Sequence, residues 1–236
     1  WLFSLQVSKA LPFGGRLSFY AFNAFNRQGK YETTGRAQRL FSECGDTIGV
    51  AGSTCSLAIN AWQDGKIAEA LELAVEALDL DRTTGDRRSL GRDLRTLGDL
   101  HATVGSDEQA LEYYAQALGN DRDIGYRQGE AANLACSGKV LLNQGRAMEA
   151  LTRFKEGLEV AISINARPLV GEIFLGMAVA YRENTQSPGW EVSRICAQNA
   201  HDLGEELGTA GLITMGLTSL ALAELRLERP DEALRL

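Results

Sequence analysis

The sequence contains few of the residues that build metal sites and disulfide frameworks. It has two histidines and four cysteines in 236 residues, and no cysteines stand in a C-x-x-C spacing or beside a histidine. We therefore expect no metal site, and we interpret the cysteines as reduced, mostly buried thiols of a cytoplasmic protein. No apolar run approaches the roughly 18 residues of a membrane-spanning helix, and the first residues lack the pattern of a signal peptide.

The sequence also lacks the signals of a nucleic-acid-binding protein or an enzyme. Its net charge of −7 argues against phosphate contacts, which need clustered lysines and arginines. Apart from the turn at Gly14-Gly15, glycines near turns occur singly, so no phosphate-binding loop is expected. His101 lies on a helical stripe and is interpreted as a packed residue. We predict no catalytic residue and no cofactor.

Residues 1–43 differ from the rest of the chain. They hold nine of the 17 aromatic residues and carry a net charge of +4, which leaves −11 for the remainder. Apolar and polar residues alternate from Trp1 to Ser8, and Pro12 to Gly15 is a turn signal. We expect an N-terminal segment over 1–43 that is a β-hairpin or irregular, followed by a helical repeat domain over 44–236.

The amino-acid sequence from Ser8 to Tyr31 resembles that of the last strands of TonB-dependent outer-membrane receptors. The stretch from Asn23 to Arg27 corresponds to the Asn-x-x-[Asn/Asp]-Arg pattern of that family. The family's closing strand is replaced by Ser42 to Gly45, and two strands cannot close a barrel. One interpretation of the chain is therefore a receptor fragment, from the outer membrane, fused to repeats.

From residue 50 onward, glycines, alanines and leucines recur at a constant interval of 40. The interval separates the members of four series: Gly65, Gly105 and Gly145; Ala70, Ala110 and Ala150; Leu71, Leu111 and Leu151; and Gly85, Gly125 and Asn165. Such a period is typical of a solenoid of repeated helical pairs. We expect Gly98 and Ala110 to lie where two helices cross closely. The fourth series, which begins at Gly85, predicts helix ends with a residue in the left-handed conformation.

The pattern is clearest between Leu94 and Leu118, with Leu97-Gly98, Ala110, Tyr114 and Ala117. It resembles the tetratricopeptide repeat, and its length resembles the Pins-like and kinesin-light-chain-like members. The resemblance implies an all-α, right-handed superhelical solenoid of antiparallel helix pairs. We expect repeats over about 50–89, 90–129, 130–169, 170–212 and 213–236, with the last one truncated and extra residues between Thr185 and Trp190.

In that architecture the first helix of each pair lines a concave groove, where a partner peptide or helix would bind. The first-helix positions outside the packing stripe are Ile59, Trp62, Arg92, Arg95, Asp99, Thr103, Lys139, Asn143 and Arg182. The first two predict an apolar end of the groove. Arg92, Arg95 and Lys139 would attract an acidic protein partner, and neither nucleic acid nor a membrane is expected as a partner of residues 44–236.

A second interpretation is a regulatory or spacer segment, without a ligand, of a larger bacterial signalling ATPase, cyclase or transcription activator. We interpret the chain as a fragment, because it starts on Trp1 and ends inside a repeat. The last repeat is expected to leave apolar side chains uncovered at Leu217, Leu220, Leu225 and Leu227. Uncovered apolar residues predict fraying or self-association.

Overall fold

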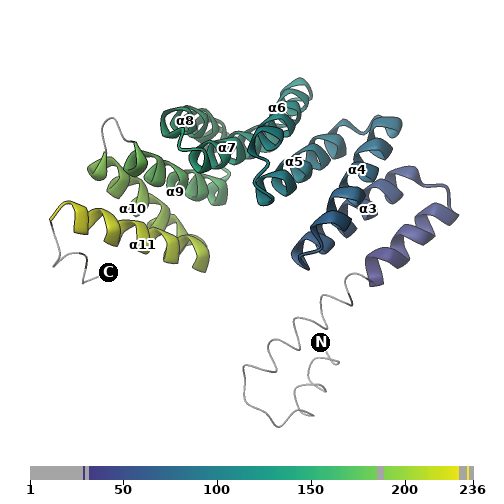
Figure 1. The fold of residues 1–236 in the computed structure, drawn as a ribbon, viewed down its shortest axis with the longest axis horizontal. Helices are drawn as coiled ribbons and strands as arrows, with labels where there is room; N and C mark the ends of the chain where they lie inside the picture. The colour runs from purple at the N-terminus through teal and green to yellow at the C-terminus, as the bar shows by residue number, and fades with distance from the viewer. Residues whose placement is uncertain (1–28, 30–31, 185–188, 229–232, 234–236) are drawn as a thin grey trace, which may run out of the picture. The chain divides into compact units, whose positions relative to one another are not determined.

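The computed structural model describes residues 29, 32–184, 189–228 and 233, and every regular element within those residues is a helix (Figure 1). The chain divides into two compact units between Asp86 and Arg87. The first unit contains α3 (Thr47–Gln63) and α4 (Ile67–Thr84). The second contains α5 (Arg87–Thr103), α6 (Asp107–Asp123), α7 (Arg127–Asn143), α8 (Ala147–Ser163), α9 (Arg167–Glu183), α10 (Trp190–Leu207) and α11 (Ala210–Arg226). The predicted all-α fold of antiparallel helix pairs is confirmed.

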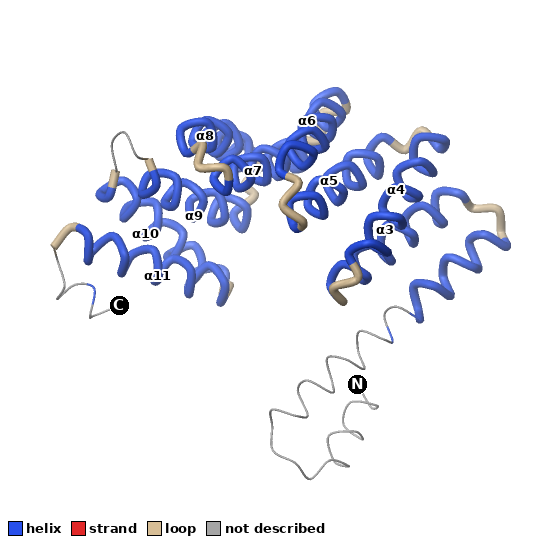
Figure 2. The backbone as a smooth tube through the Cα atoms, viewed as in Figure 1, coloured by secondary structure: helices blue, strands red, loops and turns tan. Residues whose placement is uncertain are grey.

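Most of the helices end next to a residue in the left-handed conformation, whereas α9 ends at Asn184 in an extended one. Positive φ angles recur every 20 residues, at Gly45, Gly65, Gly85, Gly105, Gly125, Gly145 and Asn165. Figure 2 shows the short loops that result. The backbone N–H of Ser106 donates to the carbonyl of His101 at 2.9 Å, which is the bond that closes a helix end of this type. The left-handed ends predicted from the fourth series are confirmed.

The small residues of the repeat lie where helices approach closely. A Cβ added to Gly98 of α5 would stand 2.5 Å from the ring of Tyr114 on α6, and one added to Gly138 would stand 2.6 Å from Phe154. Ala110 and Ala150 are both fully buried. Glycine or alanine at these positions therefore sets the spacing within each pair.

The fourth pair is longer than the others. α6 and α8 each begin 40 residues after the preceding second helix, whereas α10 begins 43 residues after α8. The extra residues expected between Thr185 and Trp190 are thus present. They do not interrupt the core, because one apolar cluster runs from Leu118 through Phe154 and Ile173 to Leu220.

Part of the segment interpreted as a hairpin or as irregular is helical. Residues 32–43 form a helix, and Gln38 donates to the Thr54 hydroxyl of α3 at 2.8 Å. Alanine, glutamine, arginine and leucine in this stretch are good helix formers. The hairpin predicted within residues 1–27 lies outside the described residues, and the boundary at residue 43 stays a prediction.

Candidate functional site

The first helices of the pairs in the second unit form one continuous surface. α5 contacts α7, α7 contacts α9, and α9 contacts α11. Each second helix packs against the first helix of its own pair and against that of the next, as α8 does with α7 and α9. This arrangement leaves one face of the first helices free of the second helices, which is the face expected to bind a partner.

A cleft of about 490 Å³ opens on this face between α7, α9 and α11. Its apolar wall consists of Leu142, Leu175, Val179, Leu212 and Met215. Its polar lining includes Lys139, Asn143, Glu172, Glu183, Thr209 and Ser219. A mostly apolar concavity with a few polar groups at its rim has the composition of a binding site rather than of a plain solvated surface.

Two of the predicted groove residues, Lys139 and Asn143, line this cleft. Lys139 Nζ lies 3.0 Å from the Glu172 carboxylate of α9, and both side chains are half-exposed. Burial lowers the pKa of Lys139, the Glu172 charge raises it, and the net direction is upward. The charge of Lys139 is therefore largely offset by a neighbour within the groove.

The side chain of Asp99 does not point outward into the groove as the sequence predicts. It is partly buried, and its carboxylate accepts a 2.6 Å hydrogen bond from the Tyr114 hydroxyl. Burial raises the pKa of Asp99, although the Tyr114 hydrogen bond and the charges of Arg95 and Lys139 oppose that shift. Burial and the Asp99 charge raise the pKa of Tyr114 above its ordinary range. Asp99 thus joins α5 to α6 at the floor of the groove.

The predicted arginines have different surroundings. Arg92 lies 3.1 Å from the buried carboxylate of Asp93, and Arg182 lies 3.5 Å from Glu183. Arg95 makes no side-chain hydrogen bond or ion pair within the described part of the chain, and it is partly exposed. The Arg95 charge acts on the carboxylates of Asp99 and Asp121 and lowers the pKa of each.

The remaining predicted positions are not brought into the cleft. Thr103 is exposed at the end of α5, and its hydroxyl donates to the Asp99 carbonyl at 2.8 Å. Ile59 and Trp62 are partly buried on α3, in the first unit. Their membership of a common groove stays a prediction.

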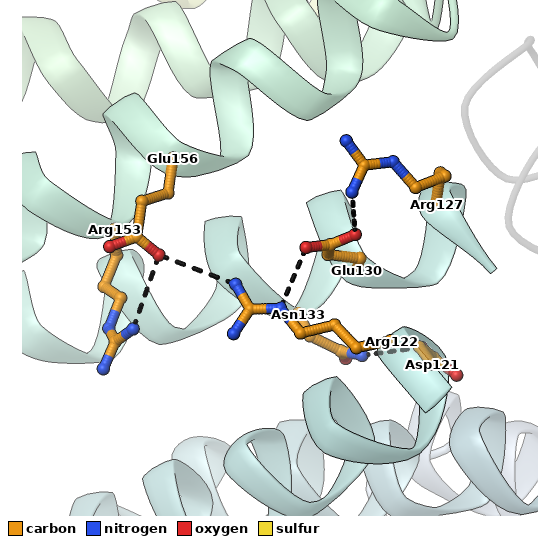
Figure 3. A network of polar contacts seen from close by, with 7 residues as sticks. All are labelled: Asp121, Arg122, Arg127, Glu130, Asn133, Arg153 and Glu156. Atoms are coloured by element: carbon orange, nitrogen blue, oxygen red, sulfur yellow. Dashed lines mark hydrogen bonds and ion pairs between the residues drawn. The ribbon is translucent and has the colours of Figure 1, made fainter. Parts of the chain in front are cut away.

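A polar network behind the groove was not anticipated from the sequence (Figure 3). Glu130 of α7 is only 5% exposed, and its carboxylate lies 2.9 Å from Arg122 and 2.6 Å from Arg127. Arg122 of α6 also reaches Glu156 of α8 at 3.8 Å. The network therefore fixes α7, which carries Lys139, against both second helices that flank it.

A second buried carboxylate continues this network. Asp121 of α6 accepts a 2.9 Å hydrogen bond from Asn133 of α7 (Figure 3). Burial raises the pKa of Asp121, while hydrogen bonds from Asn120 and Asn133 act in the opposite direction. Glu130 could have been noticed in the sequence, because the equivalent residues 40 positions away are Leu90 and Val170.

The titratable side chains expected to be structural are packed. Cys136 lies close to Asp99, and burial raises the pKa of its thiol to about 12. The ring of His101 stacks on Tyr113 with centroids 5.2 Å apart. All four cysteines are free.

In the described ranges no three His, Cys, Asp or Glu side chains gather as a metal site would need, and none of the helices there could cross a bilayer.

Comparison with known proteins identifies the repeat. A family described as tetratricopeptide repeat matches residues 50–123. The photosystem I assembly protein Ycf3 of Rippkaea orientalis is 34% identical over 111 residues, which cover 43% of this chain and 57% of that protein. The chain thus spans little more than half the length of this curated relative.

Two solved structures have the same fold at low sequence identity. BtubC (BKLC) from P. vanneervenii superimposes with a TM-score of 0.75 and 15% identity, covering 89% of this chain and 87% of that one. A Rap protein complexed with Competence and Sporulation Factor gives a TM-score of 0.68 and 15% identity, covering 92% and 70%.

Proposed function

We propose that this chain, whose helix pairs are tetratricopeptide repeats, is an interaction scaffold that binds a segment of a partner protein between α7, α9 and α11. The observation that carries the proposal is the cleft of about 490 Å³ on the face of the first helices. Burial of one leucine-sized side chain in such a cleft contributes about 1.5–3 kcal/mol, so a short segment with one or two anchors would bind reversibly.

The kind of partner is supported by the fold and by the free donors of the groove. The Rap structure named above contains a bound factor, and its fold is that of this chain. We propose that the ligand of this chain is a peptide or helical segment. Of the cations predicted to attract an acidic partner, Lys139 and Arg92 each form an ion pair with a carboxylate. Arg95 acts on Asp99 only through its charge, so we assign to Arg95 the principal contact with an acidic ligand residue.

We propose that the scaffold has no catalytic activity of its own and is located in the cytoplasm. A raised thiol pKa keeps Cys136 protonated at neutral pH, which makes it a poor nucleophile. Four free cysteines suit a reducing compartment, where thiols are kept from forming disulfides.

We also propose weak self-association through α11. The stripe expected to be uncovered is narrower than predicted, because Leu220 is 2% exposed and belongs to the core. Leu225 and Leu222 are nevertheless exposed by 56% and 43%. Sedimentation over a range of concentrations should show a dimer that Leu225→Glu abolishes, because a charge would have to be buried there. Identical monomeric behaviour of both proteins would refute self-association.

A matched pair of substitutions tests the binding proposal. Met215 lines the cleft on α11 and is 59% exposed, whereas Met148 lies on α8, outside the cleft, and is 55% exposed. Met215→Glu and Met148→Glu therefore make the same chemical change at equal exposure. A library of random displayed peptides should be enriched on the wild type and on Met148→Glu, but not on Met215→Glu.

The alternative is a regulatory or spacer segment without a ligand. It predicts that no peptide is enriched more strongly on the wild type than on the Met215→Glu variant. That result would remove the cleft as a binding site and favour the alternative.

A further inference from the structure

We infer that the cleft between α7, α9 and α11 receives an aromatic side chain that carries a hydroxyl, so that a tyrosine anchors the ligand of this chain. This inference rests on the proposed function, and it adds the chemistry of the ligand residue that enters the cleft. Three features support it: the size of the cleft, its open side at Gly211, and the hydroxyl of Ser219 on its floor.

The cleft is larger than one aliphatic side chain requires. An apolar cavity of about 150 Å³ is large enough for benzene, and the cleft measures about 490 Å³. Leu175 and Leu212 form its buried floor, at 7% and 5% exposure. An aromatic ring would cover this floor, whereas a single leucine would leave part of it in contact with water.

One side of the cleft is open because position 211 has no side chain. Gly211 of α11 lines the cleft, and a Cβ added to it would meet nothing within 4 Å. The second residue of α5, α7 and α9 is in turn Arg88, Gln128 and Pro168. Since each of those helices carries a side chain at this position, the open side is particular to α11.

The walls around this space are held in place by close helix contacts. A Cβ added to Gly171 of α9 would stand 2.8 Å from the Leu212 side chain, and one added to Gly204 of α10 would stand 2.9 Å from it. A Cβ added to Gly216 of α11 would stand 2.8 Å from His201 of α10. Because α11 is already in close contact with both neighbours, the cleft cannot close by a small shift of this helix.

The hydroxyl of Ser219 places a polar group at the bottom of this apolar space. Ser219 lines the cleft from α11 and is 9% exposed. Thr214 and Thr218 on the same helix donate to carbonyls four residues earlier, at 2.9 and 2.8 Å. The Ser219 hydroxyl makes no hydrogen bond to any residue that the structure describes. A nearly buried hydroxyl of this kind needs a partner from outside the chain.

Tyrosine combines the ring and the polar group that the cleft requires. Its hydroxyl stands at the far end of the ring, so a side chain that enters ring first brings the hydroxyl to Ser219. Phenylalanine would bury the Ser219 hydroxyl without a partner. The N–H of tryptophan lies on the flank of its ring system, not at the far end. Met215, at the rim, offers a thioether sulfur to the edge of the ring.

The experiment titrates the full chain with the N-acetyl amides of tyrosine, phenylalanine and leucine, and binding is followed by NMR. We expect the tyrosine amide to bind about three- to tenfold more tightly than the phenylalanine amide, as one hydrogen bond would give. Ser219→Ala should remove that difference, because the variant lacks the partner of the tyrosine hydroxyl. The leucine amide should bind most weakly.

A second substitution tests the open side of the cleft. Gly211→Leu fills the space and should weaken binding of the tyrosine amide at least about tenfold. Gly119→Leu on α6 is the matched control, since Gly119 is also exposed, helical and free of neighbours within 4 Å, but lies outside the cleft. Leucine has the higher helix propensity, so melting curves of both variants should show no loss of stability.

Three results would overturn the inference while leaving the cleft as a binding site. They are equal affinities of the tyrosine and phenylalanine amides, a tyrosine preference that persists in Ser219→Ala, and unchanged binding to Gly211→Leu. Binding of none of the three amides would overturn it as well. The proposed function would fall with it only if the peptide library also enriched nothing on the wild type.

Discussion

Gly176 of α9 approaches Phe154 of α8 so closely that a Cβ on the glycine would stand 2.5 Å from the phenylalanine ring. Phe154 is fully buried, and its ring also lies against Gly138 of α7. The contact joins the third helix pair to the fourth directly beneath the cleft, because Gly176 also lines it.

Gly176→Ala should therefore destabilise the fold by about 1–3 kcal/mol, the usual cost of overpacking a core. Gly119→Ala on α6 is the control, since nothing lies within 4 Å of the Cβ it would add. Removal of a glycine from an exposed helical position should stabilise the protein by about 0.5–1 kcal/mol. Urea denaturation measures both changes. An equal effect of the two substitutions would contradict the assigned contact.

Glu130→Gln should destabilise the chain by about 1–3 kcal/mol, because it removes the charge that two arginines share at a buried position. Glu149→Gln removes a comparable ion pair with Arg146 on an exposed surface and should change the stability little. The Glu130 effect should also persist in high salt, since screening acts mainly on exposed charges. Equal losses in the two variants would show that burial of Glu130 is unimportant.

Asp99 should make the stability of the protein depend on pH. Burial raises the pKa of Asp99 in the folded state, so the folded state holds this proton more tightly than the unfolded state. The stabilising contribution is complete at low pH and is lost as the pH rises through the folded-state pKa. The free energy of unfolding of Asp99→Asn minus that of the wild type should therefore increase as the pH rises above 3.8, the ordinary pKa of an aspartate. A difference that is constant or decreases with pH would disprove the assignment.

The four thiols should differ in reactivity. Burial raises the pKa of Cys136 to about 12 and that of Cys196 to about 11, and Cys55 is only 2% exposed. Cys44 is exposed. Iodoacetamide at mildly alkaline pH should therefore alkylate Cys44 well before the others, and denaturant should remove the difference. Mass spectrometry of the digested protein measures the alkylation of each cysteine. Alkylation of Cys136 or Cys196 before Cys44 would contradict the burial of these thiols on α7 and α10.

The fold could be predicted from the sequence because its determinants repeat. The left-handed residues and the close contacts of Gly98 and Gly138 occur at constant intervals, so each repetition supports the same interpretation. The helix over 32–43 was missed because the alternation that favours strands in the first residues was extended across the whole aromatic-rich segment. Leu220 was placed on the uncovered face, although α10 packs against it.

The candidate site could be predicted only in part, because its determinants do not repeat. Lys139 and Asn143, chosen by their register on α7, line the cleft, and their role in binding stays a prediction. The α11 wall of the cleft was not assigned, since Met215 has no counterpart of the same chemistry in the other repeats. The Glu130 network likewise occurs only where α6, α7 and α8 meet. The environment of Asp99 depends on a tyrosine from the neighbouring helix.

Because left-handed residues recur every 20 positions from Gly45 to Asn165, the turns that precede and follow each helix pair in that range have the same geometry. Excision of residues 127–166 would bring Tyr126 next to Arg167, in the same turn geometry as the removed Arg127. A duplication of the same stretch would preserve every junction. Insertion or removal of 40 residues would therefore change the length of the face formed by the first helices in whole steps, without redesign of the connecting turns.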